Sequence, residues 1–326
     1  MDILIEQDFF EVFMEDYFNQ TKSLELETMF TTYTGIKLHT DMSDEYIFSK
    51  PILKSLISHN KSLHTKEGFI SKSQNNEFKY LSLAFCGSKE SDWVDEFEKN
   101  GGLYFHRDNY KIKISDILQN HDTIYLNKVD DFKWSDILPF KNLPGRGALI
   151  ADNYILADEY KMKHNALPII KELGKKLEQI TILTCTNSNT KRVNTENGFE
   201  QAQKQLRRSI TDEIESNQAR INNYKSKENI DIRVQVLPFY KGILHKDHKF
   251  DLHDRRLMTR YSVVTVGKGF DLLPLNRKEV NDYKVTVRTL FDKEAYDDIK
   301  NFTPTYNQYV KWYKEKHNPE TFLPFE

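Results

Sequence analysis

Side chains that could do phosphorus or metal chemistry are densest between residues 245 and 271. Histidine, aspartate and arginine stand consecutively at His253, Asp254 and Arg255, and Gly267-Lys268-Gly269-Phe270-Asp271 follows. An imidazole can attack phosphorus to form a covalent intermediate, and cations beside it stabilise the phosphoryl oxygens. We therefore take His253 as the candidate nucleophile or general base, and Arg255 and Lys268 as candidate phosphate-binding cations.

The same region has the composition of a zinc or manganese site. Its potential ligands are His245, Asp247, His248, Asp251, His253 and Asp254. No helix is predicted there to align two ligands four residues apart, so we expect a solvated polar loop and predict no metal and no cofactor. The two cysteines, Cys86 and Cys185, form no C-x-x-C motif and lie in apolar contexts, which predicts buried, reduced thiols.

The order of these residues resembles the signature of the phospholipase D superfamily, in which a histidine attacks phosphorus, a lysine binds a phosphoryl oxygen and an aspartate orients a histidine. The interval from His253 to Gly267 is that of the signature, with Arg255 at the lysine position and Arg260 at the aspartate position. The resemblance implies that Arg255 and Arg260 bind phosphate. Only one motif is present, whereas the superfamily brings two together, so a homodimer is expected if two histidines are needed.

A closer resemblance covers residues 145–295. It is to the phospholipase D-like domain at the C-terminus of proteins with a microtubule-interacting-and-trafficking module. That domain carries an acidic strand end, then His-Asp-Arg, then a Gly-basic-Gly-hydrophobic-Asp run. The corresponding segments here are Asp152-Asn153-Tyr154-Ile155, His253-Asp254-Arg255 and Gly267-Lys268-Gly269-Phe270-Asp271. The resemblance implies that these groups gather at one edge of the sheet, which we call the rim. It also implies that Asp152 or Asp254 orients His253.

The elements that must position this rim follow the alternating pattern of an α/β fold. Ala148–Asp152 is typical of a buried strand, and a helix with Leu167 and Leu173 on its apolar face follows. Further strands are predicted at 180–185, 230–237, 257–258, 261–266 and 284–290, with a long polar helix at 199–227. This pattern predicts a phospholipase D-like, mostly parallel sheet flanked by helices, with its chemistry at the carboxyl ends of the strands.

The segment Leu143-Pro-Gly-Arg-Gly147 is the clearest linker signal. It predicts an N-terminal domain over 1–140, a phospholipase D-like domain over 145–300, and a C-terminal helix or tail over 301–326. The first forty residues have helical spacing of apolar side chains and 78–86 has strand character, so we expect a smaller α+β domain of unknown role before the linker.

Charge divides the chain in the same way. Residues 1–140 hold 15 basic and 24 acidic side chains, a net charge of −9, and residues 141–326 hold 32 and 25, a net charge of +7. A basic second half favours a nucleic acid or another phosphodiester ligand, and the acidic first half favours a protein partner. Mutual neutralisation of the two halves across an interface is the alternative.

Two functions follow from this reading. The first is a phosphodiester-directed effector, a nuclease or nuclease-like protein, using a single degenerate phospholipase D-type histidine site. The second is a non-catalytic module that binds nucleic acid, a phosphorylated ligand or a protein partner on the same rim. The composition, rich in Asn, Lys, Phe and Tyr, suggests a bacterial source, where such relatives occur in anti-phage defence. No apolar run spans a bilayer and no export signal is read, so a cytoplasmic protein is expected.

Overall fold

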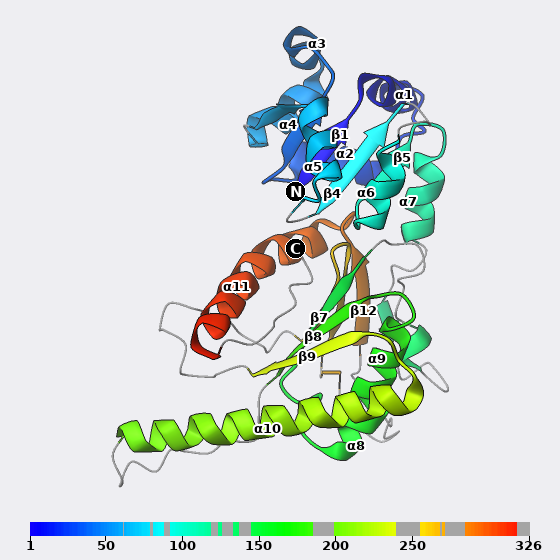
Figure 1. Ribbon diagram of the computed structural model, residues 1–326. Coiled ribbons are helices and arrows are strands. Elements are labelled where there is room, and N and C mark those ends of the chain that lie inside the picture. The colour runs from blue at the N-terminus through cyan, green and yellow to red at the C-terminus, as the bar shows by residue number, and fades with distance from the viewer. Residues whose placement is uncertain are drawn as a thin grey trace.

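The computed structural model describes eleven parts of the chain, and it describes the helix over 199–210 and Trp312 without their side chains. The described residues are 1–60, 62–78, 81–87, 92–118, 123–125, 133–136, 145–184, 199–238, 255–267, 269–270 and 284–317. Within these ranges the chain is α/β and forms two sheets, one above the other in Figure 1. Over the same ranges, every helix is too short or too polar to cross a membrane.

The first sheet has five strands in the order β3-β2-β1-β4-β5, and every neighbouring pair is parallel. Its strands are β1 (Asp2–Ile5), β2 (Lys37–Thr40), β3 (Leu63–Thr65), β4 (Ser82–Cys86) and β5 (Leu103–His106). Its helices are α1 (Gln7–Phe18), α2 (Leu24–Thr32), α3 (Asp44–Ser49), α4 (Pro51–Asn60), α5 (Lys66–Gln74), α6 (Val94–Lys99) and α7 (Tyr110–Leu118). The expected α+β domain is therefore wrong, because the first sheet is a parallel α/β sheet.

Short polar side chains start several of these helices. The hydroxyls of Ser23, Ser43 and Thr65 accept hydrogen bonds from main-chain N–H groups in the first turns of α2, α3 and α5. Such caps satisfy donors that have no partner inside the helix. They explain why the chain turns from coil or strand into helix at these three positions.

The second sheet has seven strands in the order β6-β12-β11-β10-β7-β8-β9. Its strands are β6 (Thr123–Tyr125), β7 (Gly147–Ala151), β8 (Gln179–Thr184), β9 (Arg233–Pro238), β10 (Arg256–Met258), β11 (Ser262–Val266) and β12 (Lys284–Thr289). Only β7, β8 and β9 run parallel to one another, and the other four pairings are antiparallel. The expected mostly parallel sheet is thus a mixed sheet.

Six helical segments of the described residues accompany the second sheet. They are η2 (Trp134–Asp136), α8 (Glu159–Lys161), the π-helical turn Met162–Ala166, α9 (Leu167–Leu173), α10 (Phe199–Glu228) and α11 (Lys293–His317). Strand β6 pairs with β12, and Trp134 packs on Phe270 at 5.6 Å between ring centroids. Residues 123–125 and Trp134, which the sequence places in the N-terminal domain, therefore pack with the second sheet.

Helix α10 covers the free edge of β9 with its carboxyl-terminal part, and Figure 1 shows its amino-terminal part running on beyond the sheet. Ile214 and Ile221 are buried. Between them the side-chain amide of Gln218 donates to the carbonyl of Val234 and accepts from the N–H of Val236, both at 2.8 Å. The Gln218 amide therefore pairs with main-chain groups of this edge strand.

Aromatic residues join the two sheets into one core. Tyr33 stacks on Tyr296 at 4.4 Å between ring centroids, and its hydroxyl donates to the carbonyl of Leu290 at 2.9 Å. The hydroxyl of Tyr261, which is fully buried, donates to the carbonyl of Gly101 at 2.6 Å. One continuous cluster of buried apolar side chains runs through both halves.

Candidate functional site

Asp152 follows β7 directly and is completely buried. Oδ1 accepts hydrogen bonds from the main-chain N–H groups of Tyr154 at 2.6 Å and Ile155 at 2.9 Å, and Oδ2 accepts one from Phe270 at 2.7 Å. A buried carboxylate needs such donors to offset the loss of water. Asp152 thereby holds the turn after β7 against the segment after β11.

Arg255 lies across from Asp152. In the β7–β10 ladder Arg256 pairs with Ala151, so the register places Arg255 opposite Asp152, where antiparallel neighbours share a face. Gly269 has a φ of +110°, and a Cβ at this position would lie 2.8 Å from Arg255 Nη1 and 2.9 Å from Asp152 Oδ2. The structure therefore brings Asp152 and Arg255 together, and only glycine fits between them.

The guanidinium of Arg255 is only partly engaged. Its Nε is buried and has no hydrogen-bond partner among the described residues. Its Cζ lies 5.5 Å from the centroid of the Tyr154 ring, and the side chain of Tyr154 is 43% exposed. A cation over an accessible aromatic face can bind an anion while the ring remains free to stack.

The turn after β7 leads into α8, which carries aromatic and basic side chains, and Lys161 Nζ lies 6.0 Å from the centroid of the Tyr154 ring. We call this group of side chains the Tyr154 patch, and it comprises Tyr154, Tyr160, Lys161, Lys163, His164 and Arg255. The side chain of Tyr160 is 58% exposed, and its ring lies 4.5 Å from that of His164. Sequence reasoning missed this patch, although Tyr154, Tyr160, Lys161 and Lys163 stand within ten residues of one another in the sequence.

Acidic residues of the same segment are Asp158 and Glu159, both exposed. Asp158 Oδ1 caps α8 by accepting from the N–H of Lys161 at 2.7 Å. One of the two acids therefore serves as the cap of its own helix.

Arg260 is not part of this rim. It follows β10 at the opposite end of the sheet, is 4% exposed, and donates from Nη1 to the carbonyl of Asn100 at 3.2 Å. Burial lowers the pKa of its guanidinium. The expectation that Arg260 binds phosphate beside Arg255 is wrong, because β10 carries the chain from one end of the sheet to the other between the two arginines.

The remaining predicted site residues, His253, Asp254 and Lys268, lie outside the described residues, as do the other candidate metal ligands between 245 and 251 and the second thiol, Cys185. The prediction that Asp152 orients His253 therefore stays a prediction. Over the ranges that the structure describes, no group of three His, Cys, Asp or Glu side chains could hold a metal ion.

A second polar cluster, which sequence reasoning also missed, lies at the carboxyl edge of the first sheet. The strand order reverses between β1 and β4, the place at which α/β sheets often bind ligands. There the buried Glu6 carboxylate pairs with Lys66 Nζ at 2.7 Å and accepts from the N–H of Gly87 at 2.8 Å. Both carboxylate oxygens are thus engaged, and the cluster ties α5 and β4 to β1.

The neighbouring thiol is not a nucleophile. Cys86 ends β4, is fully buried and is free, as the sequence predicts. Burial, with the nearby Glu6 carboxylate, raises the pKa of the Cys86 thiol far above neutrality. Because the thiolate is the reactive form, this cysteine is inert.

Comparison of the chain with protein-family models gives no match, and comparison with the curated proteins gives none either. The resemblance of residues 145–295 to a phospholipase D-like domain therefore rests on the sequence motifs alone. Any function must be inferred from the geometry of the rim.

Proposed function

We propose that the second half of the chain binds single-stranded nucleic acid on the Tyr154 patch, with a phosphate on Arg255 and a base against the Tyr154 ring. The observation that carries this proposal is the state of Arg255. Its Nε is buried without an acceptor among the described residues, and its guanidinium lies against an exposed ring. An unmatched buried donor next to an accessible surface favours an anionic ligand.

Two further features support the proposal. Sequence-tolerant binding of single strands combines cations that follow the backbone with aromatic rings on which bases stack, and the Tyr154 patch offers both. The second half also carries the net charge of +7. A non-catalytic binding module accounts for the described geometry because the Asp152 carboxylate is already held by three main-chain donors.

Hydrolysis of the bound strand is the second candidate. It is favoured by one observation: His253 stands two residues before Arg255, whose place on the rim the structure describes. The imidazole would form a P–N bond as the ester oxygen leaves and is protonated. Water would then attack the phosphohistidine, breaking the P–N bond and giving a phosphate monoester and free imidazole. A setting in prokaryotic anti-phage defence, a protein partner for the acidic first half and a homodimer remain proposals by analogy.

The test measures fluorescence anisotropy of a labelled single-stranded oligodeoxynucleotide with the full chain over a range of salt concentrations. Tyr154→Ala should weaken binding about tenfold, the size of a lost stacking contact. Arg255→Gln should weaken it and should reduce the slope of log affinity against log salt by about one ion.

The matched controls are Tyr125→Ala and Arg146→Gln. Tyr125 is 51% exposed on β6, and Arg146 is exposed at the other end of β7, where it pairs with Glu178. Both variants should bind as the wild type does. Equal losses in controls and patch variants, or no loss in either patch variant, would overturn the proposal.

The same samples separate binding from hydrolysis. Cleavage of the oligonucleotide that His253→Ala abolishes, with binding kept, supports the hydrolytic candidate. Binding without cleavage in the wild type supports the binding module.

A further inference from the structure

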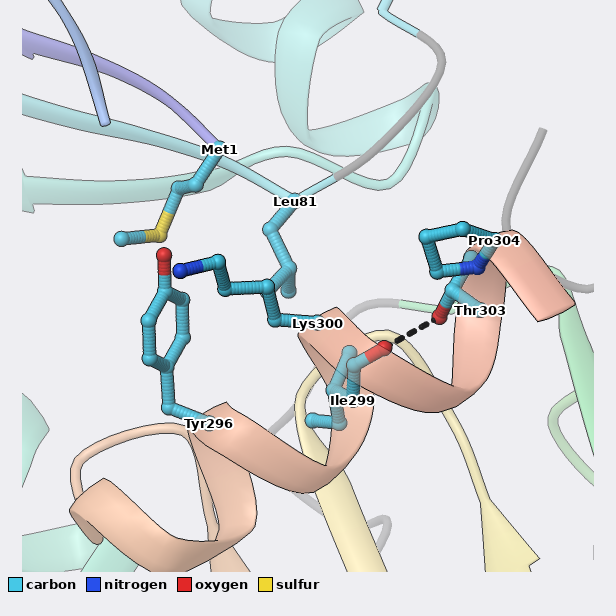
Figure 2. A pocket seen from close by; sticks show the side chains of 7 residues that line it. All are labelled: Met1, Leu81, Tyr296, Ile299, Lys300, Thr303 and Pro304. Atoms are coloured by element: carbon cyan, nitrogen blue, oxygen red, sulfur yellow. Dashed lines mark hydrogen bonds between the residues drawn. The ribbon is translucent and has the colours of Figure 1, made fainter. Parts of the chain in front are cut away.

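A cavity of about 180 Å³ lies between the amino edge of the first sheet and helix α11 (Figure 2). Met1 and Leu81 stand directly before the paired strands β1 and β4 and form one wall. Helix α11 forms the other wall with Tyr296, Ile299, Lys300, Thr303 and Pro304. The cavity is thus built from both halves of the chain.

The polar atoms of the helical wall are mostly turned to protein partners. The Tyr296 hydroxyl donates to the carbonyl of Thr34 at 2.6 Å. The Thr303 hydroxyl donates to the carbonyl of Ile299 at 2.6 Å, and Figure 2 shows this second bond. The surface left to a ligand is therefore largely carbon. A cavity of about 150 Å³ holds a benzene molecule, so this one accommodates a single ring or a short branched chain.

Lys300 brings a charged side chain to this apolar lining, and the amino-terminal ammonium of Met1 donates to the carbonyl of Gly35 at 3.0 Å. Lys300 Nζ donates to the Thr34 hydroxyl at 2.6 Å, and among the described residues no carboxylate lies within ion-pair distance of it. The aliphatic part of the Lys300 side chain packs on Gly35, and a Cβ at position 35 would lie 3.1 Å from Lys300 Cε. Gly35 also has a φ of +80°. The Lys300 ammonium is therefore held in place by the neutral hydroxyl of Thr34, and Figure 2 shows the Lys300 side chain among the residues that line the cavity.

We propose that this cavity binds a small monocarboxylate whose apolar body is about the size of one aromatic ring, with the carboxylate paired to Lys300 Nζ. The apolar lining takes the body of the ligand, and the ammonium supplies the charge that selects an acid over a neutral analogue. Because both walls contribute, the bound acid contacts both halves of the chain.

Isothermal titration of the full chain with benzoate tests the proposal, with benzyl alcohol as the neutral analogue. Benzoate should bind saturably at one site, and benzyl alcohol should bind about tenfold more weakly, the loss expected for one charge-assisted hydrogen bond. Lys300→Met keeps the length of the side-chain stem. It should lower the affinity for benzoate to the affinity measured for benzyl alcohol. Lys311→Met, on an exposed position of the same helix, should leave both affinities unchanged.

A second experiment uses variants whose larger side chains fill the cavity. Ile299→Phe and, separately, Leu81→Phe should abolish binding of both probes, and the far-ultraviolet circular dichroism and melting curve of each variant show whether it folds. No saturable binding of benzoate at millimolar concentration, equal affinity for benzoate and benzyl alcohol, or benzoate affinity unchanged by Lys300→Met would each overturn the proposal.

Discussion

A carboxylate removed from water requires other hydrogen-bond donors, and Asp152 finds three of them in the main chain. Two belong to the turn after β7 and the third to Phe270, which is far away in the sequence. These hydrogen bonds hold the turn after β7 against the segment that contains Phe270. Arg255 lies opposite Asp152, and its buried Nε has no hydrogen-bond partner among the described residues.

Asp152→Asn should destabilise the fold by about 2–4 kcal/mol, because one carboxylate oxygen becomes an NH₂ group that faces a main-chain N–H. Urea unfolding at neutral pH measures this loss. Asp158→Asn is the control, since this exposed residue caps α8 and asparagine caps nearly as well as aspartate. A change of less than about 1 kcal/mol for Asp152→Asn would contradict the assigned role.

Gly269→Ala should cost at least about 2 kcal/mol, since it combines a disfavoured φ with contacts to Arg255 and Asp152 below 3.0 Å. It should also weaken oligonucleotide binding by displacing Arg255. Gly267→Ala is a close control, because nothing lies within 4 Å of a Cβ there. Equal stability of the two variants in urea would show that the glycine is not required.

Asp2 should contribute stability that depends on pH. Burial alone would raise the pKa of Asp2, but hydrogen bonds from His39 and Lys72 outweigh burial and lower the pKa to about 2. The folded pKa lies below the ordinary value of 3.8, so the stabilisation is complete above pH 3.8 and is lost as the pH falls towards 2.

Asp2→Asn should therefore lower the free energy of unfolding by about 1–2 kcal/mol at pH 7, after allowance for solvent screening, and by almost nothing near pH 2. Denaturant titrations over this pH range measure the difference. Asp44→Asn, at an exposed position in α3, should show a smaller dependence. A difference for Asp2→Asn that is constant with pH would contradict the assignment.

At the scale of elements, the sequence predicted strands better than it predicted their directions. The apolar runs of β7 and β8 and the alternation in β9 were sufficient to locate them, and α10 was predicted within a residue of its observed end. Nothing in a period of two residues tells whether a strand runs parallel or antiparallel to its neighbour. The antiparallel direction of β10 was missed for this reason. Arg260 was assigned to the site from the spacing of the superfamily signature, and that spacing does not show that β10 separates Arg260 from Arg255.

Strand β1 was missed for a different reason. Ile3, Leu4 and Ile5 form a short apolar run, and the phenylalanines of α1 follow at once, so the whole segment matched helical spacing. Short apolar runs do not distinguish a buried strand from a helix. The Tyr154 patch was missed because a search for catalytic residue types passes over lysine and tyrosine on a surface.

The turn between β10 and β11 anchors the second sheet in the first half. The Tyr261 hydroxyl reaches the carbonyls of Ser82 at 3.1 Å and Gly101 at 2.6 Å. Tyr261→Phe should cost about 1–3 kcal/mol, because buried acceptors lose their donor. Thermal unfolding measures this, with Tyr125→Phe on exposed β6 as a control that should be neutral. A neutral Tyr261→Phe would mean that these carbonyls find other donors.

At the scale of the molecule, the two sheets share one apolar core and several hydrogen bonds between halves. We therefore expect a single cooperative unfolding transition. Hydrogen exchange should give the slowest amides of β4 and of β7 the same opening free energy and the same dependence on denaturant. Tyr33→Ala should separate the two values by removing the ring that stacks on Tyr296. Distinct values in the wild type would show that the halves unfold independently.

The Gln218 amide has a consequence for solubility. An unprotected edge strand invites strands of other molecules to add to the sheet, which is how many proteins aggregate. Among the described strands β9 is an edge of the second sheet, and the amide of Gln218 offers Val234 and Val236 the donor and the acceptor that an incoming strand would bring. A helix thereby imitates a neighbouring strand at one position. Glutamate could not do the same, since an ionised carboxylate has no proton to give to the carbonyl of Val234.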